Sequence, residues 1–328
     1  METTTFAPAT LSSSRTATTT TTKLRFKNIT LADLPAINRV LQQEDSRTCD
    51  YTIGGLYMWI NYFRYQYCIV RDTLFIKGVS EESLDDVAFS FPIGPMPTDR
   101  ALALIDDYCD ANGLTMRLSA IPESKLSDIL AYDSSLIPDE LTDWADYLYD
   151  AKSLASLSGK KLSKKRNHVN RFMADNPGAR LEPLTLDNIH EVLDTFVAWS
   201  EEAANDPDDP DALRATAIEE RRQVEQVLSD YICYPFEGAI LRDDKGRMVA
   251  FTIGEKIGDT LFVHIEKMDH NVAGAGETIN CLFARMMTER YPDIAFINRE
   301  EDAGDPGLRR AKESYRPVMM LKKYDLYR

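Results

Sequence analysis

The sequence predicts an α/β protein whose mixed sheets are covered by helices and in which one α/β module is used twice. Strand-like and helix-like segments follow one another in a similar order in both halves of the chain. Gly, Asp and Pro stand between many of these segments, where tight turns favour them. The length of 328 residues fits two domains of modest size, and 44% hydrophobic residues suffice for a sizeable core.

In the first half, ordered structure is expected from residue 24 onwards. Residues 24–29 alternate as in a strand, and Thr30 is placed to cap a helix in which Leu34, Ile37 and Leu41 recur at helical spacing. Three strands that read as antiparallel follow at residues 65–70, 73–77 and 87–91. A helix at 99–112 ends before a glycine, and a further strand covers residues 114–120.

The second half returns to this order after residue 179. Residues 243–246 are a strong hairpin-turn signal, and Asp305 followed by Pro306 begins a short helix. The expected strands are 180–184, 238–242, 248–257, 260–268, 294–298 and 318–323, and the longer helices are 185–203, 213–229 and 276–290. We therefore expect one domain at 24–150, a linker with a basic helix at 151–178 and a second domain at 179–328.

Composition narrows the class of protein. A net charge of −15 repels polyanions, so general coating of nucleic acid is excluded. No run of about 18 uncharged apolar residues is present, so no transmembrane segment is expected. Five widely spaced cysteines lack a CxxC pair for zinc or redox work, and residues 1–23 are rich in Thr and Ser without a secretory signal. We expect a disordered tail on a cytoplasmic protein.

A basic segment stands out against this acidic background. Residues 160–171 carry six Lys or Arg and no acid. On a helix, one narrow arc would hold Lys161, Lys164, His168 and Arg171. The arc is either a solvated face or a site for an anion such as phosphate or an RNA backbone.

Two further segments carry candidate site residues. His264 and Glu266 share one face of the strand at 260–268. A turn with Gly274 and Gly276 opens the following helix. Its backbone N–H groups can hold an anion, or its glycines simply let the chain turn. Farther along, a polar loop begins at Asn298, and the short helix after it places cationic and apolar side chains on separate faces. The cationic face has Arg309, Lys312 and Arg316, and the apolar face has Leu308, Ala311 and Tyr315.

These segments carry a family resemblance. A strand, a Q/R-x-x-G-x-G/A turn and a helix resemble the acyl-CoA N-acyltransferase fold of the Gcn5-related acetyltransferases, with Asn271 where that motif has Gln or Arg. Residues 50–59, 157–172 and 298–317 together resemble the phosphatidylglycerol lysyltransferase C-terminal domain family, which is built from two such folds in tandem and is related to the Fem-type aminoacyltransferases.

The resemblance implies transfer of an acyl or aminoacyl group, from aminoacyl-tRNA, to an amine or hydroxyl of a small-molecule, peptide or lipid acceptor. The basic helix would then meet the tRNA. Such a reaction needs aligned substrates, a base and donors for the oxyanion. We expect Glu266 or His264 as base and Tyr315 as proton donor, and three cations as anion-holding groups, namely Arg299, Arg309 and Lys312. We expect no metal site and name no certain cofactor.

Two alternatives stay open. One is an acyl-CoA-dependent N-acyltransferase whose turn at Asn271, Gly274 and Gly276 holds the pyrophosphate. The other is a non-catalytic ligand-binding module that kept the fold and lost the chemistry.

Overall fold

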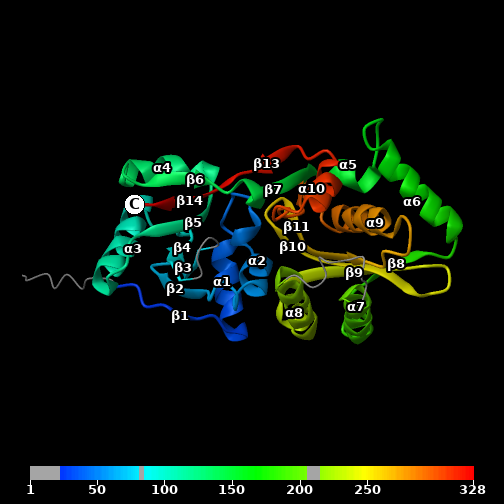
Figure 1. Cartoon of the computed structure of the whole chain (residues 1–328), viewed down its shortest axis with the longest axis horizontal. Coiled ribbons are helices and arrows are strands. Elements are labelled where there is room, and N and C mark those ends of the chain that lie inside the picture. The colour runs from blue at the N-terminus through cyan, green and yellow to red at the C-terminus, as the bar shows by residue number, and fades with distance from the viewer. Residues whose placement is uncertain (1–22, 81–84, 205–214) are drawn as a thin grey trace, which may run out of the picture.

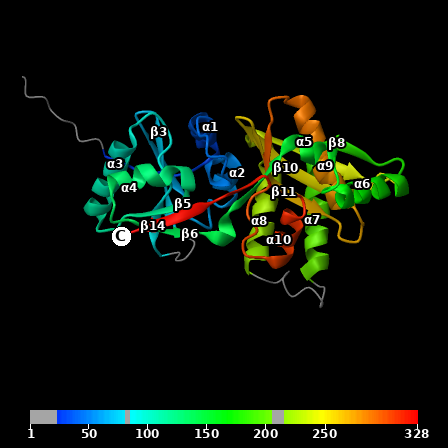
Figure 2. The same cartoon turned by 90° about the horizontal axis from the view of Figure 1, so that it is seen from above.

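The computed structural model describes residues 23–80, 85–204 and 215–328 (Figure 1). The expected tail at 1–23 lies outside this part of the chain, except for Lys23. Two mixed sheets and their helices lie side by side, which confirms the α/β class and the two tandem units (Figure 2). None of the helices in the described residues is long and apolar enough to cross a membrane.

Both sheets have seven strands in the same spatial order. The first sheet contains, in order, β1 (Lys27–Asn28), β2 (Gln66–Val70), β3 (Thr73–Val79), β4 (Val87–Phe89), β5 (Arg117–Pro122), β14 (Lys323–Tyr327) and β6 (Ile137–Glu140). The second contains β8 (Arg180–Pro183), β9 (Phe236–Arg242), β10 (Met248–Ile257), β11 (Thr260–Met268), β12 (Phe296–Asn298), β7 (Asp146–Asp150) and β13 (Met319–Leu321). In each sheet one pair is parallel, β4 with β5 and β11 with β12, and the other pairs are antiparallel.

The two units exchange one strand each. β7 follows the strands of the first unit in the sequence but lies between β12 and β13 of the second sheet. β14 comes last in the chain but lies between β5 and β6 of the first sheet. Each exchanged strand pairs on both sides and so completes the backbone hydrogen bonds of two neighbours.

This exchange differs from two expectations. A domain limit at residue 150 places β7 in the wrong sheet, and a second domain reaching residue 328 does the same for β14. The single strand expected at 318–323 is wrong, because β13 and β14 belong to different sheets and the chain changes sheet at Lys322. Pairing partners decide sheet membership, and an alternating strand pattern does not name them.

Helices cover both faces of the second sheet. In Figure 1, α9 (Ala275–Arg290) lies on one face, and α7 (Ile189–Ala204) and α8 (Ala215–Ser229) lie on the other. The expected basic linker helix is realised as two helices, α5 (Ala151–Ser156) and α6 (Ser163–Asp175), which both pack on α9. The remaining helices are α1 (Leu34–Leu41), α2 (Ile53–Met58), α3 (Thr98–Asn112), α4 (Leu126–Tyr132) and α10 (Pro306–Glu313), with one-turn helices at Leu31–Asp33, Cys49–Tyr51, Glu123–Lys125, Thr142–Trp144 and Tyr231–Cys233.

Local signals in the sequence account for several helix ends. Gly113 closes α3 in a left-handed conformation with φ 65°, as expected of a helix-ending glycine. The Asp305 carboxylate accepts the Leu308 N–H at 2.6 Å and caps α10. The largest apolar cluster includes side chains of both units, and the Tyr57 ring of α2 lies 4.8 Å from that of Tyr234. The boundary between the units is therefore part of the core.

Candidate functional site

The polar loop that follows β12 is held rigidly between the two units. Asn298 is fully buried, and its amide donates to the Arg47 carbonyl at 2.7 Å and to Asp146 at 2.8 Å. Its side-chain oxygen accepts the Glu300 N–H at 2.6 Å, and Glu300 adopts a left-handed φ of 57°. Lys312 donates to the carbonyls of Arg299 and Glu301. These contacts fix the directions of the side chains at 299, 300 and 301.

On one side of this loop, a buried ammonium lies among carboxylates. Lys323, at the start of β14, is 2.7 Å from Asp146, 2.7 Å from Asp50 and 3.6 Å from Glu301. Asp146 is fully buried and also accepts the Cys49 N–H at 2.7 Å. The cluster therefore joins the two exchanged strands, because Asp146 begins β7 and Lys323 begins β14.

The protonation of this cluster follows from burial and from Lys323. Burial raises the pKa of Asp50 to about 6 and also raises the pKa of Glu301. Burial opposes ionisation of Asp146 too, but the charge and hydrogen bond of Lys323 hold the pKa of Asp146 below its ordinary value. Burial lowers the pKa of Lys323, yet Asp146 and Asp50 outweigh it and leave that pKa raised. Lys323 is therefore a permanent cation.

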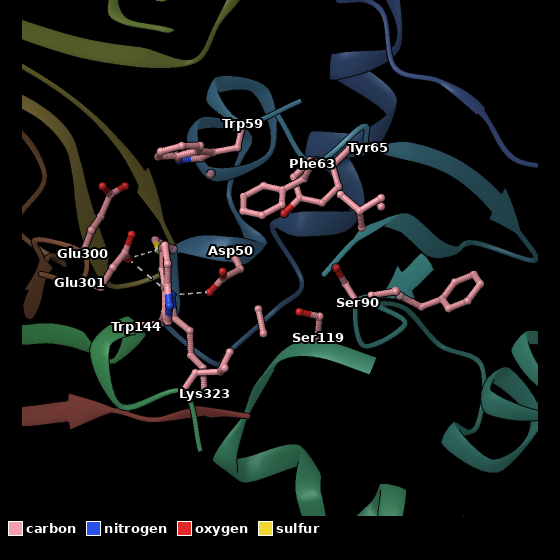
Figure 3. A pocket seen from close by; sticks show the side chains of 18 residues that line it. Asp50, Trp59, Phe63, Tyr65, Ser90, Ser119, Trp144, Glu300, Glu301 and Lys323 are labelled. Carbon is pink, nitrogen blue, oxygen red and sulfur yellow. Dashed lines mark hydrogen bonds and ion pairs between the residues drawn. The ribbon is translucent and has the colours of Figure 1, made fainter. Parts of the chain in front are cut away.

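A cavity of about 60 Å³ opens beside this cluster. Figure 3 shows Glu300, Glu301 and Asp50 on one side of it and Ser90 and Ser119 on another. Aromatic side chains form much of the remaining wall, namely Trp59, Phe63, Tyr65 and Trp144. Carboxylates, hydroxyls and half-buried aromatic rings thus converge on one hollow between the units, as they do in ligand sites.

The segment at 50–59 builds the first unit's side of the boundary. Thr52 caps α2 by accepting the Gly55 N–H at 2.8 Å. A Cβ at Gly54 would overlap the His264 ring, and a Cβ at Gly55 would overlap the Cys49 carbonyl. Glycine is therefore required at 54 because the two units approach closely there, and at 55 because two neighbouring turns of the chain do so.

His264 is held by two carboxylates instead of facing open space. Its Nδ1 lies 2.7 Å from Glu300 and its Nε2 lies 2.9 Å from Glu255, and the side chain is buried. Burial lowers the pKa of His264, but the two hydrogen-bonded carboxylates prevail and raise it to about 10. A doubly paired imidazolium has no lone pair to accept a proton, so this geometry does not favour the expected role of His264 as base.

On the other side of the loop, three of the expected site residues come together, namely Glu266, Arg299 and Tyr315. Arg299 donates to Glu266 at 2.8 Å, and its guanidinium lies 4.7 Å from the centre of the Tyr315 ring. Glu266 also accepts from Asn280 at 3.1 Å, and the Lys165 ammonium of α6 lies 4.3 Å from the centre of the Tyr315 ring. One guanidinium nitrogen here, the Nη1 of Arg299, is thus buried without a hydrogen-bond partner among the described residues.

The other expected anion-holding cations are occupied within the protein. Arg309 donates to Asp302 at 2.7 and 2.9 Å and to Asp143 at 2.7 Å. Lys312 is buried and binds the two loop carbonyls. Both residues order the loop and its neighbours, so their geometry does not favour direct contact with a substrate anion.

The glycine turn before α9 is covered by α6. A Cβ at Gly274 would lie 2.9 Å from the His168 carbonyl and 3.2 Å from Cβ of Phe172. A Cβ at Gly276 would overlap the Met268 side chain, and Ala275 is fully buried. Exposed Asn271 folds its own N–H onto Asp269 at 2.9 Å. The glycines thus permit helix packing, and the turn does not offer the open cradle that the acyl-CoA alternative requires.

Three of the four residues of the basic arc lie on the solvent side of α6. Lys161 precedes the helix, and with Lys164, His168 and Arg171 it is exposed, while Val169 and Phe172 are buried against the second unit. Beside Lys161 a second cavity of about 420 Å³ is lined by Lys160, Arg316 and Tyr315 among others. Lys161 of the basic arc and Tyr315, whose ring Arg299 contacts, therefore line the same cavity.

A metal ion has little room in the acidic cluster. Cys49, Asp146 and Glu301 place ligand atoms within 4.8 Å of one another. The Lys323 ammonium lies within 3.6 Å of all three, at 3.3, 2.7 and 3.6 Å respectively. Within the described residues, this one grouping with metal-ligand spacing already encloses a cation.

Sequence reasoning missed the ion cluster beside the first cavity. Asp50, Asp146 and Lys323 are separated by roughly a hundred residues or more, and no motif joins them. The signals available were the glycine pair at 54–55 and the polar residues at 300–301, which mark close approach and a strand-end site.

Comparisons with known proteins agree with this fold. Residues 41–327 match the family model described as "Phosphatidylglycerol lysyltransferase, C-terminal". A conserved protein of unknown function from Bacteroides thetaiotaomicron is 34% identical, with a TM-score of 0.83 over 92% of this chain and 98% of that chain.

Two more distant structures share the fold. A C-terminal domain assigned to a lysylphosphatidylglycerol synthetase of Agrobacterium fabrum is 15% identical, with a TM-score of 0.64 over 91% of this chain and 92% of that one. L-PGS from Bacillus licheniformis is 15% identical, with a TM-score of 0.56 over 80% and 84%. An uncharacterised protein of Mycoplasmoides gallisepticum is 23% identical over 194 residues, and the match spans 59% of this chain but only 58% of that relative.

Proposed function

The chain belongs to the phosphatidylglycerol lysyltransferase C-terminal family, and from this premise we propose that it is an aminoacyltransferase whose donor is an aminoacyl-tRNA. The acceptor supplies an amine or a hydroxyl group. The transfer replaces the ester bond to the terminal ribose of the tRNA by an amide or a new ester.

One contrast in the second unit supports a tRNA donor over acyl-CoA. The glycine turn that would hold a pyrophosphate is covered by α6, and the outer face of the same helix presents exposed cations. Lys161, Lys164 and His168 make no ion pair with any described residue, whereas Arg171 reaches Asp175 only at 3.6 Å. A surface of unpaired cations on an otherwise acidic protein fits an extended polyanion.

The group around Tyr315 suits acyl transfer. The Nη1 of Arg299, which lacks a hydrogen-bond partner among the described residues, would donate to the oxyanion that forms when the acceptor attacks the ester carbonyl. Burial keeps the pKa of Tyr315 far above its ordinary value, so its hydroxyl stays protonated and can donate to the leaving ribose oxygen. Glu266 remains the candidate base, paired with Arg299 until a substrate arrives.

The test is a donor comparison with the whole protein. tRNA pools charged with single radiolabelled amino acids are incubated with a lipid extract, a cell-wall peptide or small amines, and acyl-CoAs are supplied in parallel. We expect label to move from tRNA to one acceptor class and no thiol release from acyl-CoA. Thiol release without tRNA turnover would establish the acyl-CoA alternative, and inactivity with every donor would favour a binding module.

A variant pair links the activity to α6. Replacing Lys161, Lys164 and Arg171 by Gln should weaken tRNA binding and lower the slope of log Kd against log salt by roughly 2 to 3, since each lost phosphate contact removes about 0.7 to 0.9. The control replaces Arg39, Arg100 and Lys245, which are exposed on other elements, and should leave the slope nearly unchanged. Equal slopes for both variants would show that α6 does not meet the donor.

A further inference from the structure

We infer that the second cavity, which lies between α5, the segment before α6 and the segment before β13, binds a nucleotide through its phosphate and its ribose. The lining residues come from segments 149–154, 158–162 and 315–318. A nucleotide of this kind stands at the end of a tRNA, so its source rests on the proposed function, whereas the binding site itself does not.

Positive charge dominates the rim of this cavity. Its three cations are Lys160, Lys161 and Arg316, and all are exposed. Their side chains make no ion pair or hydrogen bond with any described residue. The one carboxylate among the lining residues is Asp150, which caps α5 by accepting the Ser153 N–H at 2.7 Å. Three cations thus stand beside one occupied carboxylate in a protein with net charge −15, so the cavity attracts an anion such as phosphate.

The backbone holds one of these cations in an unusual conformation. Arg316 has a left-handed φ of 62° and stands directly before Pro317. This region is unfavourable for a residue with a Cβ, and residues held in it are enriched at ligand sites. The turn between α10 and β13 therefore places an unpaired cation at the cavity at a cost in folding stability.

A buried hydroxyl without a partner lines the same cavity. Tyr315 is 6% exposed, and its hydroxyl makes no hydrogen bond with any described residue. Two cations contact its ring, Lys165 at 4.3 Å and Arg299 at 4.7 Å from the ring centre. These contacts hold the ring and leave the hydroxyl unpaired. A buried hydroxyl normally has a partner, and a ribose oxygen would supply one.

Size and continuity favour a nucleotide over a bare phosphate. The cavity volume of about 420 Å³ lies in the range of roughly 300 to 1,000 Å³ that is typical of small-ligand sites. Buried Leu154 and Leu162 add apolar wall against which sugar carbons can pack. Lys161 lines the cavity and also belongs to the basic arc, so a polyanion that lies along the arc can end in the cavity.

The test measures nucleotide binding to the whole protein. Equilibrium dialysis with radiolabelled AMP is carried out at fixed ionic strength. Adenosine is the competitor that lacks the phosphate, and glycerol 3-phosphate is the competitor that lacks the nucleoside. We expect AMP to bind at least tenfold more tightly than adenosine and several-fold more tightly than glycerol 3-phosphate.

Variants assign the binding to this cavity. Arg316→Gln and Lys160→Gln should each weaken AMP binding by roughly tenfold, as expected for loss of one charge-assisted hydrogen bond, and should leave adenosine binding nearly unchanged. Tyr315→Phe should weaken AMP and adenosine binding alike by a few-fold, because it removes the hydroxyl that meets the ribose. The control is Arg310→Gln, an exposed cation on α10 that does not line the cavity, which should bind AMP as the parent does. Melting temperatures show that each variant is folded.

Equal binding of AMP and adenosine, or AMP binding that Arg316→Gln and Lys160→Gln both leave unchanged, would overturn the inference. Displacement of labelled AMP by uncharged tRNA places the terminal nucleotide of the donor in this cavity, and AMP binding that tRNA does not displace assigns the site to a free nucleotide. AMP binding without any transfer would leave this site in place and refute the proposed donor. Transfer from tRNA without AMP binding would do the reverse.

Discussion

Replacing Lys323 by Met removes the one ammonium that three carboxylates share. The side chain is 2% exposed, and Met has similar length and volume, so the change removes charge and leaves little cavity. Asp146 is fully buried and would keep only the hydrogen bonds from Asn298 and Cys49. Breaking a buried ion pair from one side costs about 3 to 5 kcal/mol, so we expect a loss of that size in the free energy of unfolding at pH 7.

The sign of the pH dependence tests the reasoning. In the parent protein the pKa of Asp146 is below its ordinary value, so its contribution to stability is present above the unfolded pKa and is lost as pH falls through the folded pKa. Without Lys323 the three carboxyls are buried and unpaired, so they favour the protonated form. The difference between variant and parent should therefore shrink as pH falls from 7 toward 4.

Urea unfolding at several pH values measures this difference, and the neighbouring residue is the control. Lys322 is 42% exposed and pairs with exposed Glu140, so Lys322→Met should change stability very little. If Lys323→Met is as stable as Lys322→Met at pH 7, or if its deficit grows on acidification, the ion cluster does not stabilise the fold as described.

Three other predictions follow from the same contacts. Glu266→Gln should reduce turnover by about 10²-fold at temperatures where the variant is folded, and it should also lower the melting temperature because Arg299 loses its carboxylate partner; a folded, fully active variant would remove Glu266 as the base. The folded-state pKa of Asp50 is raised to about 6, so this group makes the protein more stable as pH falls from about 6 toward 4. Asp50→Asn should remove that gain when urea unfolding is measured at several pH values. An unchanged dependence of stability on pH would contradict this prediction. Gly54→Ala should lower the melting temperature because the added Cβ meets the His264 ring. The control is Gly246→Ala, where the Cβ has open space but φ is 80°, so this variant should show only the cost of a left-handed backbone. Equal losses in melting temperature would indicate that the units do not meet closely at Gly54.

Local features of the structure could be predicted from the sequence. The cap at Asp305, the helix end at Gly113 and the outward arc of α6 depend on neighbouring residues, and the structure has each of them. The repeated element order likewise predicted two similar sheets. Neighbouring side chains decide all of these features, so one sequence is sufficient to find them.

Long-range pairing could not be predicted in the same way. Residues 146–150 and 323–327 have strand patterns that suit either sheet, and only their partners show that they are exchanged. The cavity follows from that exchange, since it depends on Lys323 beside Asp50 and Asp146. The paired state of His264 also escaped notice, because Glu255 and Glu300 lie on other strands or loops.

The exchanged strands bear on how the protein is made on the ribosome. The first sheet has a gap between β5 and β6 until residues 323–327 have been synthesised, and the pairing of Leu118 with Leu326 joins positions about 200 residues apart. Two strand edges of the first unit therefore stay open throughout translation of the second unit, and open edges invite pairing with other chains. Maturation of the first unit is timed by the last segment, so nascent chains that stop before residue 323 should depend on chaperones to avoid aggregation.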